Sequence, residues 1–244
     1  MESFGRTDTG IVRSANQDFI FFSDAPVGPL PNLYIVADGM GGHNAGDFAS
    51  RYTVESFTDK MREAAEETNY STIKLIEDTI RKINEELILK AAEQPELDGM
   101  GTTVVMCTVT DEGDMYVCNI GDSRLYIIDS QIRQITEDHS LVAEMVRNGE
   151  IKKDEARFHP KKNVVTRALS AMGVVTPDFF NIRLAEGAVV LLCSDGLSNM
   201  LSDSEIFDIV SEYRDDLSTT AQILIDRAND NGGRDNISVV LLKR

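Results

Sequence analysis

Five aspartates mark the ends of apolar, strand-like segments, and these positions are the first feature of the sequence that could support chemistry. Asp38 follows the apolar run 34–37 and precedes Gly39 and two further glycines, which let a ligand approach the backbone closely. The other four acids are Asp18, Asp122, Asp195 and Asp235. A single acid in such a place is usually a turn residue, but several that converge would repel one another strongly without cations. Since no His/Cys spacing typical of zinc accompanies them, this oxygen-only set predicts Mg²⁺ or Mn²⁺.

The segments that must position these acids are predicted from apolar periodicity. Strands are predicted at 19–22, 34–37, 102–110, 115–120, 125–129, 132–135, 189–193 and 237–242. Helices are predicted at 45–66 with Asn44 as N-cap, at 70–93, at 139–157, from the capping box of Ser202 and Glu205 onward, and after a cap at Ser218. The short connections at 111–114 and around Ser130 require antiparallel strands and predict a meander. Runs of strands and paired helices without alternation indicate an α+β layered domain.

Composition restricts the classes of partner. The chain has 244 residues, enough for one sizeable domain, and a formal net charge of −17 that disfavours nucleic acid and anionic membranes as partners. Its three cysteines, Cys107, Cys118 and Cys193, lie in apolar runs and are predicted to be buried in a reducing compartment. No leader pattern and no apolar run long enough to span a bilayer is present, so a cytoplasmic location is predicted.

Six motifs in a fixed order carry a family resemblance. They are R-S-A-N-Q-D (13–18), D-G-M-G-G-H (38–43), G-M-G-T-T (99–103), G-D-S-R (121–124), S-D-G-L (194–197) and G-G-R-D-N (232–236). Together the motifs span nearly the whole chain, and the chain resembles the bacterial branch of the metal-dependent serine/threonine protein phosphatases of the type 2C (PPM) family. The resemblance implies a single domain over 1–244. Its fold would be an α-β-β-α sandwich of two antiparallel sheets flanked by helices, with a flap at about 139–175 next to the active site.

The resemblance also implies roles for individual residues. Asp38 would bridge two tightly bound Mn²⁺ or Mg²⁺ ions, the Gly39 carbonyl would coordinate one of them, and Asp195 and Asp235 would complete the other. Asp18 would bind through metal-held water, and Asp122 would be a ligand of a weaker third metal. Arg13 would grip the substrate phosphate, for which a forked guanidinium is suited.

The implied activity is hydrolysis of phosphoserine and phosphothreonine in proteins. An acidic protein repels a phosphate monoester unless metals supply positive charge, and two cations roughly 3.5–4 Å apart can hold a bridging hydroxide for in-line attack. The implied partners are phosphorylated proteins, including a cognate bacterial Ser/Thr kinase, and the predicted oligomeric state is a monomer.

Several positions depart from the family pattern or have a simpler interpretation. Met40 stands where many eukaryotic members have histidine, so the proton donor is either His43 or metal-bound water at the third site. Gln17 stands beside Asp18, where the family usually has glutamate, and Asn199 stands where many relatives have a second aspartate for the third metal. Both changes should weaken the binding of outer or third metals. The remaining polar candidates are interpreted as non-catalytic: Ser123 and Ser194 lack a histidine partner, His139 and His159 belong to the flap, and Arg124 is expected to pair with a buried acid.

Two alternative functions belong to other classes of protein. An NTPase that uses a strand-end aspartate for Mg²⁺ is disfavoured because the sequence contains no G-x-x-x-x-G-K-[ST] loop. A catalytically weak phosphatase fold that acts as a binding or regulatory module is disfavoured because Asp38, Asp195, Asp235 and Arg13 are all intact.

Overall fold

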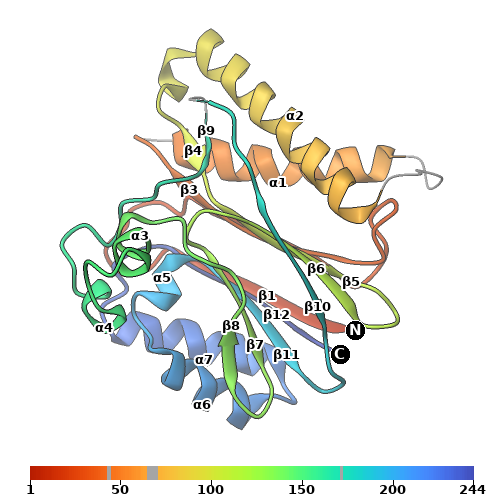
Figure 1. The fold of residues 1–244 in the computed structure, drawn as a ribbon, viewed down its shortest axis with the longest axis vertical. Helices are drawn as coiled ribbons and strands as arrows, with labels where there is room; N and C mark the ends of the chain where they lie inside the picture. The colour runs from red at the N-terminus through yellow and green to blue at the C-terminus, as the bar shows by residue number, and fades with distance from the viewer. Residues whose placement is uncertain (43–44, 65–70, 171–172) are drawn as a thin grey trace.

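The computed structural model describes residues 1–42, 45–64, 71–170 and 173–244. In this part of the chain, two antiparallel sheets pack face to face and helices cover both outer faces (Figure 1). The layers are therefore α-β-β-α, as the family resemblance implied. Predicted features on the remaining residues, namely the Asn44 cap and His43, lie outside the described residues.

The first sheet contains the two strands that carry the acids of the C-terminal half. Val189–Cys193 and Ile237–Lys243 are runs of Val, Ile and Leu that are buried almost throughout, as expected for central strands. The N-terminal strand Glu2–Asp8 was missed by the sequence analysis because its residues show no apolar pattern; it is held by pairing with the C-terminal strand. In spatial order the strands are β1 (Glu2–Asp8), β12 (Ile237–Lys243), β11 (Val189–Cys193), β7 (Arg124–Ile128) and β8 (Ile132–Gln134).

The second sheet carries the acids of the N-terminal half. Its path, in the described residues, is β10 (Asp178–Arg183), β6 (Asp114–Ile120), β5 (Val104–Val109), β3 (Leu33–Met40), β4 (Gly101–Thr102) and β9 (Leu169–Ser170), with β2 (Asp18–Ser23) paired to β3. The predicted hairpin around residues 111–114 is confirmed as β5–β6. Strand β10 was missed because it alternates only weakly, and it is held by pairing with β6.

The predicted meander is wrong at one step. Both hairpins, β5–β6 and β7–β8, are antiparallel, but they belong to different sheets. The chain crosses between the sheets at Gly121, whose φ of 108° is accessible mainly to glycine. Short connections fix the direction of a strand but not the sheet that it joins, so the sequence pattern could not reveal this crossing. As a result, Asp122 lies at the seam between the two sheets.

Helices pack on the outer face of each sheet (Figure 1). On the second sheet these are α1 (Ala45–Glu63) and α2 (Thr72–Glu93), followed by the short 3₁₀ turn η1 (Pro95–Leu97); on the first sheet they are α5 (Asp195–Ser198), α6 (Asp203–Tyr213) and α7 (Leu217–Asp230). The capping box of Ser202 and Glu205 is confirmed. The predicted cap at Ser218 is wrong: Asp216 caps α7, accepting from the Thr219 amide at 3.0 Å, because Ser218 already lies in the first turn.

The predicted helix over 139–157 is two short helices, α3 (Leu141–Arg147) and α4 (Lys153–Ala156). Gly149, with φ of 74°, ends the first of them. Both helices lie beside α5 (Figure 1) and line a cavity with it. The segment about 139–175 is called the flap below.

The three cysteines are unpaired and buried, as predicted. Among the described residues, no helix is both long enough and apolar enough to cross a bilayer.

Candidate metal centre

Two of the predicted acids face each other across one strand pair. Asp18 on β2 and Asp38 on β3 are directly opposite in the antiparallel register, so their side chains emerge on the same face. The Asp38 backbone is fixed from the other side, because its amide donates to Thr103 Oγ1 at 3.0 Å and its carbonyl accepts from the Thr103 amide at 2.9 Å. Residue pairing thus sets the place of both carboxylates.

Two serines from the side of the first sheet form hydrogen bonds with Asp18. Ser194 and Ser238 each donate a hydroxyl hydrogen bond to Asp18 Oδ2, at 2.8 and 2.7 Å. Asp18 itself is only 5% exposed, and its other oxygen, Oδ1, has no hydrogen-bond partner among the described residues. Asp195 follows Ser194 and begins α5, and its carboxyl group is close enough to Asp38 to raise the pKa of that acid.

Asp235 and Arg13 come from two loops that one asparagine ties together. Asn236 Nδ2 donates to the carbonyls of Thr9 and Ala15, at 2.9 Å each, and its Oδ1 accepts from the Gln17 amide at 2.9 Å. Arg13, in the loop so anchored, donates from Nη2 to Asp235 Oδ2 at 2.7 Å. The Arg13 side chain is nevertheless 47% exposed and remains accessible to an anion.

These side chains surround one cavity of about 340 Å³. Its wall includes Arg13, Asp38, Gly39, Asp122, Asp195 and Asp235, and Asn163 and Val165 of the flap close another side. Asp18 lies beneath the wall, opposite Asp38. The structure therefore brings together every candidate residue of the sequence analysis except His43, which lies outside the described residues.

The carboxyl groups in this cluster raise one another's pKa. Burial, together with the neighbouring acids, raises the pKa of Asp18 to about 7, of Asp122 to about 8 and of Asp195 to about 6. The pKa of Asp38 is raised well above its usual value, first by burial and then by Asp18, Asp195 and other acids. The protein alone thus disfavours the ionised forms, and bound cations would reverse this effect.

The donor set fits divalent cations that prefer oxygen. The Oδ1 atoms of both Asp18 and Asp195 are buried without a hydrogen-bond partner among the described residues, which is costly for a polar group unless a ligand or water satisfies it. In the described residues no three His, Cys, Asp or Glu side chains already converge on one point. Asp235 is instead paired with Arg13, which reduces the repulsion among the acids, whereas Asp38 and Asp195 repel each other.

Gly39 allows the start of α1 to approach the strand that carries Asp38. A Cβ atom at position 39 would lie 2.1 Å from the Gly46 carbonyl oxygen and 2.5 Å from the Gln17 carbonyl oxygen. No larger residue fits there without moving α1 or the loop after Arg13, so the backbone of Gly39 itself forms part of the cavity wall.

The polar residues that the sequence analysis interpreted as non-catalytic have structural partners. Arg124 binds Asp138 with three hydrogen bonds, at 2.7, 3.0 and 3.2 Å, which confirms its pairing with an acid whose side chain is only 14% exposed. His139 accepts from the Gly121 amide at 2.9 Å and contacts Asp178, so it fixes the crossing that carries Asp122. Ser123 is hydrogen bonded to Thr103 at 2.7 Å.

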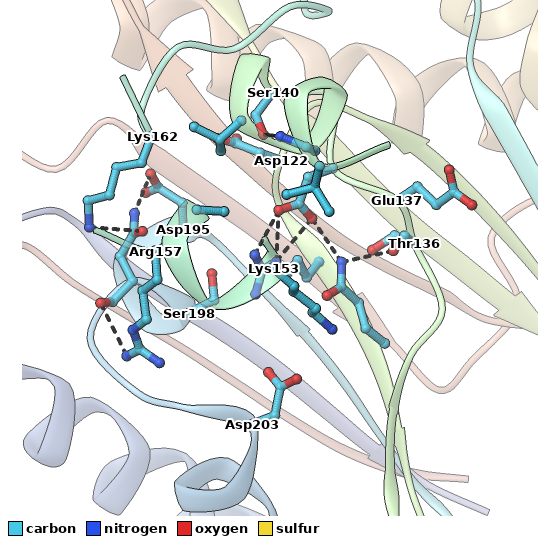
Figure 2. Close-up of a pocket in the computed structure, with 18 of the residues that line it drawn as sticks. Asp122, Thr136, Glu137, Ser140, Lys153, Arg157, Lys162, Asp195, Ser198 and Asp203 are labelled. Carbon is cyan, nitrogen blue, oxygen red and sulfur yellow. Dashed lines mark hydrogen bonds and ion pairs between the residues drawn. The ribbon is translucent and has the colours of Figure 1, made fainter. Parts of the chain in front are cut away.

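Four positioning residues were not identified as such from the sequence: Ser194, Ser238, Asn236 and Asn199. Asn199 Nδ2 donates to Asp195 Oδ2 at 2.9 Å, and Lys162 of the flap donates to Asn199 Oδ1 at 3.3 Å (Figure 2). The only available signal was proximity to an acid motif, as for Ser194 beside Asp195 and Asn236 beside Asp235. Their partners lie far away in the sequence and could not be read from it.

Comparison with known proteins gives consistent matches over nearly the whole chain. A family model described as protein phosphatase 2C matches residues 11–231. Serine/threonine phosphatase stp of Listeria innocua is 41% identical over 242 residues, covering 98% of this chain and 94% of the relative.

Two solved structures show the same fold. Serine/threonine phosphatase Stp1 from Staphylococcus aureus superposes with a TM-score of 0.90 at 32% identity, covering 100% of this chain and 94% of that chain. The catalytic domain of the phosphatase PstP in complex with two manganese ions gives a TM-score of 0.84 at 31% identity, with coverage of 98% and 96%.

Proposed function

This chain belongs to the protein phosphatase 2C family and is a metal-dependent protein serine/threonine phosphatase, and we propose that Asp38, Gly39, Asp195 and Asp235 hold two divalent cations, Mn²⁺ or Mg²⁺, in its active site. The substrates are phosphoserine and phosphothreonine residues in proteins. The observation that carries the residue assignment is the convergence of acids from both sheets, with Arg13, on one cavity of about 340 Å³.

When bound, two cations would supply positive charge for the phosphate and lower the pKa of the attacking water. The chain's own residues prepare this site. Asp38 would help to hold both cations, because it lies opposite Asp18 and is close enough to Asp195 for the two acids to repel each other. Asp18 would act through water, since its Oδ2 is already held by two serine hydroxyls and its Oδ1 is buried with no partner in the described part of the chain.

Arg13 would bind the phosphate. Its guanidinium lies at the cavity, is half exposed and is paired with a carboxylate, and a phosphate presents the same kind of oxygen acceptors. Asn236 would orient Arg13 by holding the backbone of its loop. A fork of this kind fixes the angle at which the phosphate faces the attacking water.

Asp122 would be a ligand of a third, weaker site. It lines the cavity at the crossing between the sheets, is 7% exposed, and is electrostatically coupled to Asp195. The leaving group would receive its proton either from His43, outside the described residues, or from a water molecule beside Asp122.

The proposed physiological setting is a cytoplasmic monomer that reverses the phosphorylation made by a bacterial Ser/Thr kinase and acts on that kinase itself. Three buried, unpaired cysteines support a reducing compartment. The large apolar side chains that are exposed in the described residues are dispersed over several elements, which supports a monomer. A net charge of −17 supports the absence of nucleic-acid and membrane partners.

The test is phosphate release from a phosphothreonine peptide in the presence of Mn²⁺, Mg²⁺ or EDTA. The proposal expects release with either metal and none with EDTA, with recovery when metal is added back. Full activity in EDTA would contradict the metal-dependent mechanism.

A further inference from the structure

The flap has a charge opposite to that of the protein. Residues 151–167 contain six lysines and arginines against only Asp154 and Glu155, in a chain whose net charge is −17. Cations in an acidic protein usually form ion pairs on the surface, and Arg167 does so with Asp178 at 2.6 Å. Within the described side chains, Lys153, Arg157 and Lys162 take part in no ion pair.

These three cations line a cavity that meets the metal centre. The cavity has a volume of about 740 Å³ and lies between the flap and the first sheet with its helices. Asp122 and Asp195 belong to the walls of both cavities, so the two cavities are adjacent. Figure 2 shows Lys153, Arg157 and Lys162 around this cavity together with Asp122 and Asp195.

Two of the acids in the cavity wall, Glu137 and Asp138, form ion pairs with arginines, whereas Asp203 accepts only from a tyrosine hydroxyl. Asp138 accepts from Arg124 and Gln134, Asp203 accepts from Tyr126, and Glu137 lies 3.4 Å from Arg147. Asp122 and Asp195 would be neutralised by the proposed metals and could then no longer compensate the flap cations. Among the described residues of the wall, three flap cations then face one carboxylate without an ion pair, Asp203, so positive charge remains in excess on the flap side.

The neighbouring cations reinforce one another. Lys162 contacts an amide, Asn199 Oδ1, and Arg157 contacts the Asn199 carbonyl oxygen at 3.4 Å, so neither head group is neutralised there. Phe158, 84% exposed, adds an apolar surface to the same wall. Cationic and apolar side chains together suit an extended peptide that carries a negative charge.

We propose that Lys153, Arg157 and Lys162 form an anion subsite beside the metal centre, which binds a second negatively charged side chain of the phosphoprotein substrate. This second anion is a phosphoresidue or a carboxylate located a few residues from the phosphoresidue that is cleaved. The proposal rests on the phosphatase function proposed above and adds a sequence preference to it. It also explains how a strongly acidic enzyme captures an acidic substrate, because local positive charge offsets the long-range repulsion.

The experiment compares phosphothreonine peptides that differ at one neighbouring residue, which is glutamine, glutamate or a second phosphothreonine. The varied residue is placed at successive positions before and after the phosphothreonine that is cleaved. For each peptide, kcat/KM is measured with the Mn²⁺-loaded protein. Charge pairs of this exposure contribute modestly, so two or three of them predict a preference of about tenfold for the best-placed anion over glutamine. The preference should weaken as the salt concentration rises.

The variant is Lys153→Met combined with Arg157→Gln, and the matched control is Lys161→Met. Lys161 belongs to the same segment and carries the same charge but does not line the cavity. The double variant should reduce the preference to within about twofold, while the control keeps it. Because the readout is a ratio between two peptides in one variant, a general loss of activity or stability cancels.

The outcomes separate the subsite from the catalytic proposal. Turnover of all peptides without a preference, or a preference that survives in the double variant, would overturn the subsite alone.

Phosphonate analogues of the same peptides are titrated by calorimetry in parallel, so that binding is measured without turnover. Absence of turnover with a binding preference that depends on Lys153 and Arg157 would overturn the phosphatase and support the subsite. A preference for both anions, or for phosphothreonine alone, supports the subsite and identifies the group that it takes.

Discussion

Asp18 and Asp38 lie directly opposite each other on β2 and β3, while the hydroxyls that hold Asp18 come from Ser194 and Ser238 of the other sheet. The acid cluster therefore spans the seam of the sandwich and depends on the packing of both sheets. Burial and mutual repulsion at this seam raise the pKa of the acids, and bound divalent cations would offset both effects.

Asn236 is predicted to support catalysis through the loop that carries Arg13. Asn236→Ala removes three hydrogen bonds and should lower the free energy of unfolding by about 2 kcal/mol and kcat/KM for a phosphopeptide by about tenfold. Urea unfolding and steady-state kinetics at a temperature where the variant is folded check both effects. Asn181→Ala, on an exposed position of β10, is the control. Unchanged kinetics in a folded Asn236→Ala protein would contradict the positioning role.

Stability of the metal-free protein is predicted to fall as pH rises. The acids have an unfolded pKa near 3.8 and folded values of about 6 to 8, so the folded state binds more protons between these limits. The free energy of unfolding should therefore decrease from about pH 4 to pH 8 in EDTA, and Mn²⁺ should offset the decrease.

Asp122→Asn is the variant that checks this linkage. This variant should reduce the decrease in the free energy of unfolding over the same pH range by about 2 kcal/mol. Asp208→Asn, at an exposed position of α6, should leave that decrease unchanged. Thermal unfolding in EDTA across this pH range gives the result. A metal-free protein that becomes more stable toward pH 8 would refute the account of the cluster.

Asp122→Ala is predicted to preserve two tightly bound metals and to reduce turnover, because Asp122 would serve only the weaker third site. Titration calorimetry with Mn²⁺ and phosphopeptide turnover are measured on the same preparation. If the tight pair is lost, Asp122 belongs to the central site and the assignment is wrong.

Asn199→Asp is predicted to strengthen third-metal binding. The substitution replaces an amide that donates to Asp195 with a carboxylate, so the local negative charge increases and a cation is favoured. The Mn²⁺ concentration for half-maximal activity should fall by about threefold or more. Asn181→Asp adds the same charge at a remote site. An equal shift in both variants would show a general charge effect instead of a local one.

The sequence predicted those features that depend on local pattern. Continuous apolar runs predicted β11 and β12, and strand-end positions predicted the five acids. Strands β1 and β10 could not be predicted because their residues acquire β-structure only by pairing with β12 and β6. The passage of the chain between sheets at Gly121 was missed because a tight turn does not specify which sheet follows.

The residues that support the acids were missed for a related reason. Ser238 and Asn236 act through hydrogen bonds to Asp18 and to the 9–17 loop, at the opposite end of the chain. The contact between Lys162 and Asn199 likewise joins the flap to α5. Side-chain partners at such sequence separation depend on the assembled layers and leave no periodic pattern.

The most direct test of the central claim is Asp38→Asn, measured for bound Mn²⁺ and for phosphopeptide turnover, with Asp208→Asn as the control. The amide keeps the size of the side chain but removes its charge. The variant should lose at least one tightly bound metal and at least about a thousandfold in kcat, while the control retains both. Wild-type turnover with an unchanged metal content in Asp38→Asn would contradict the proposed active site.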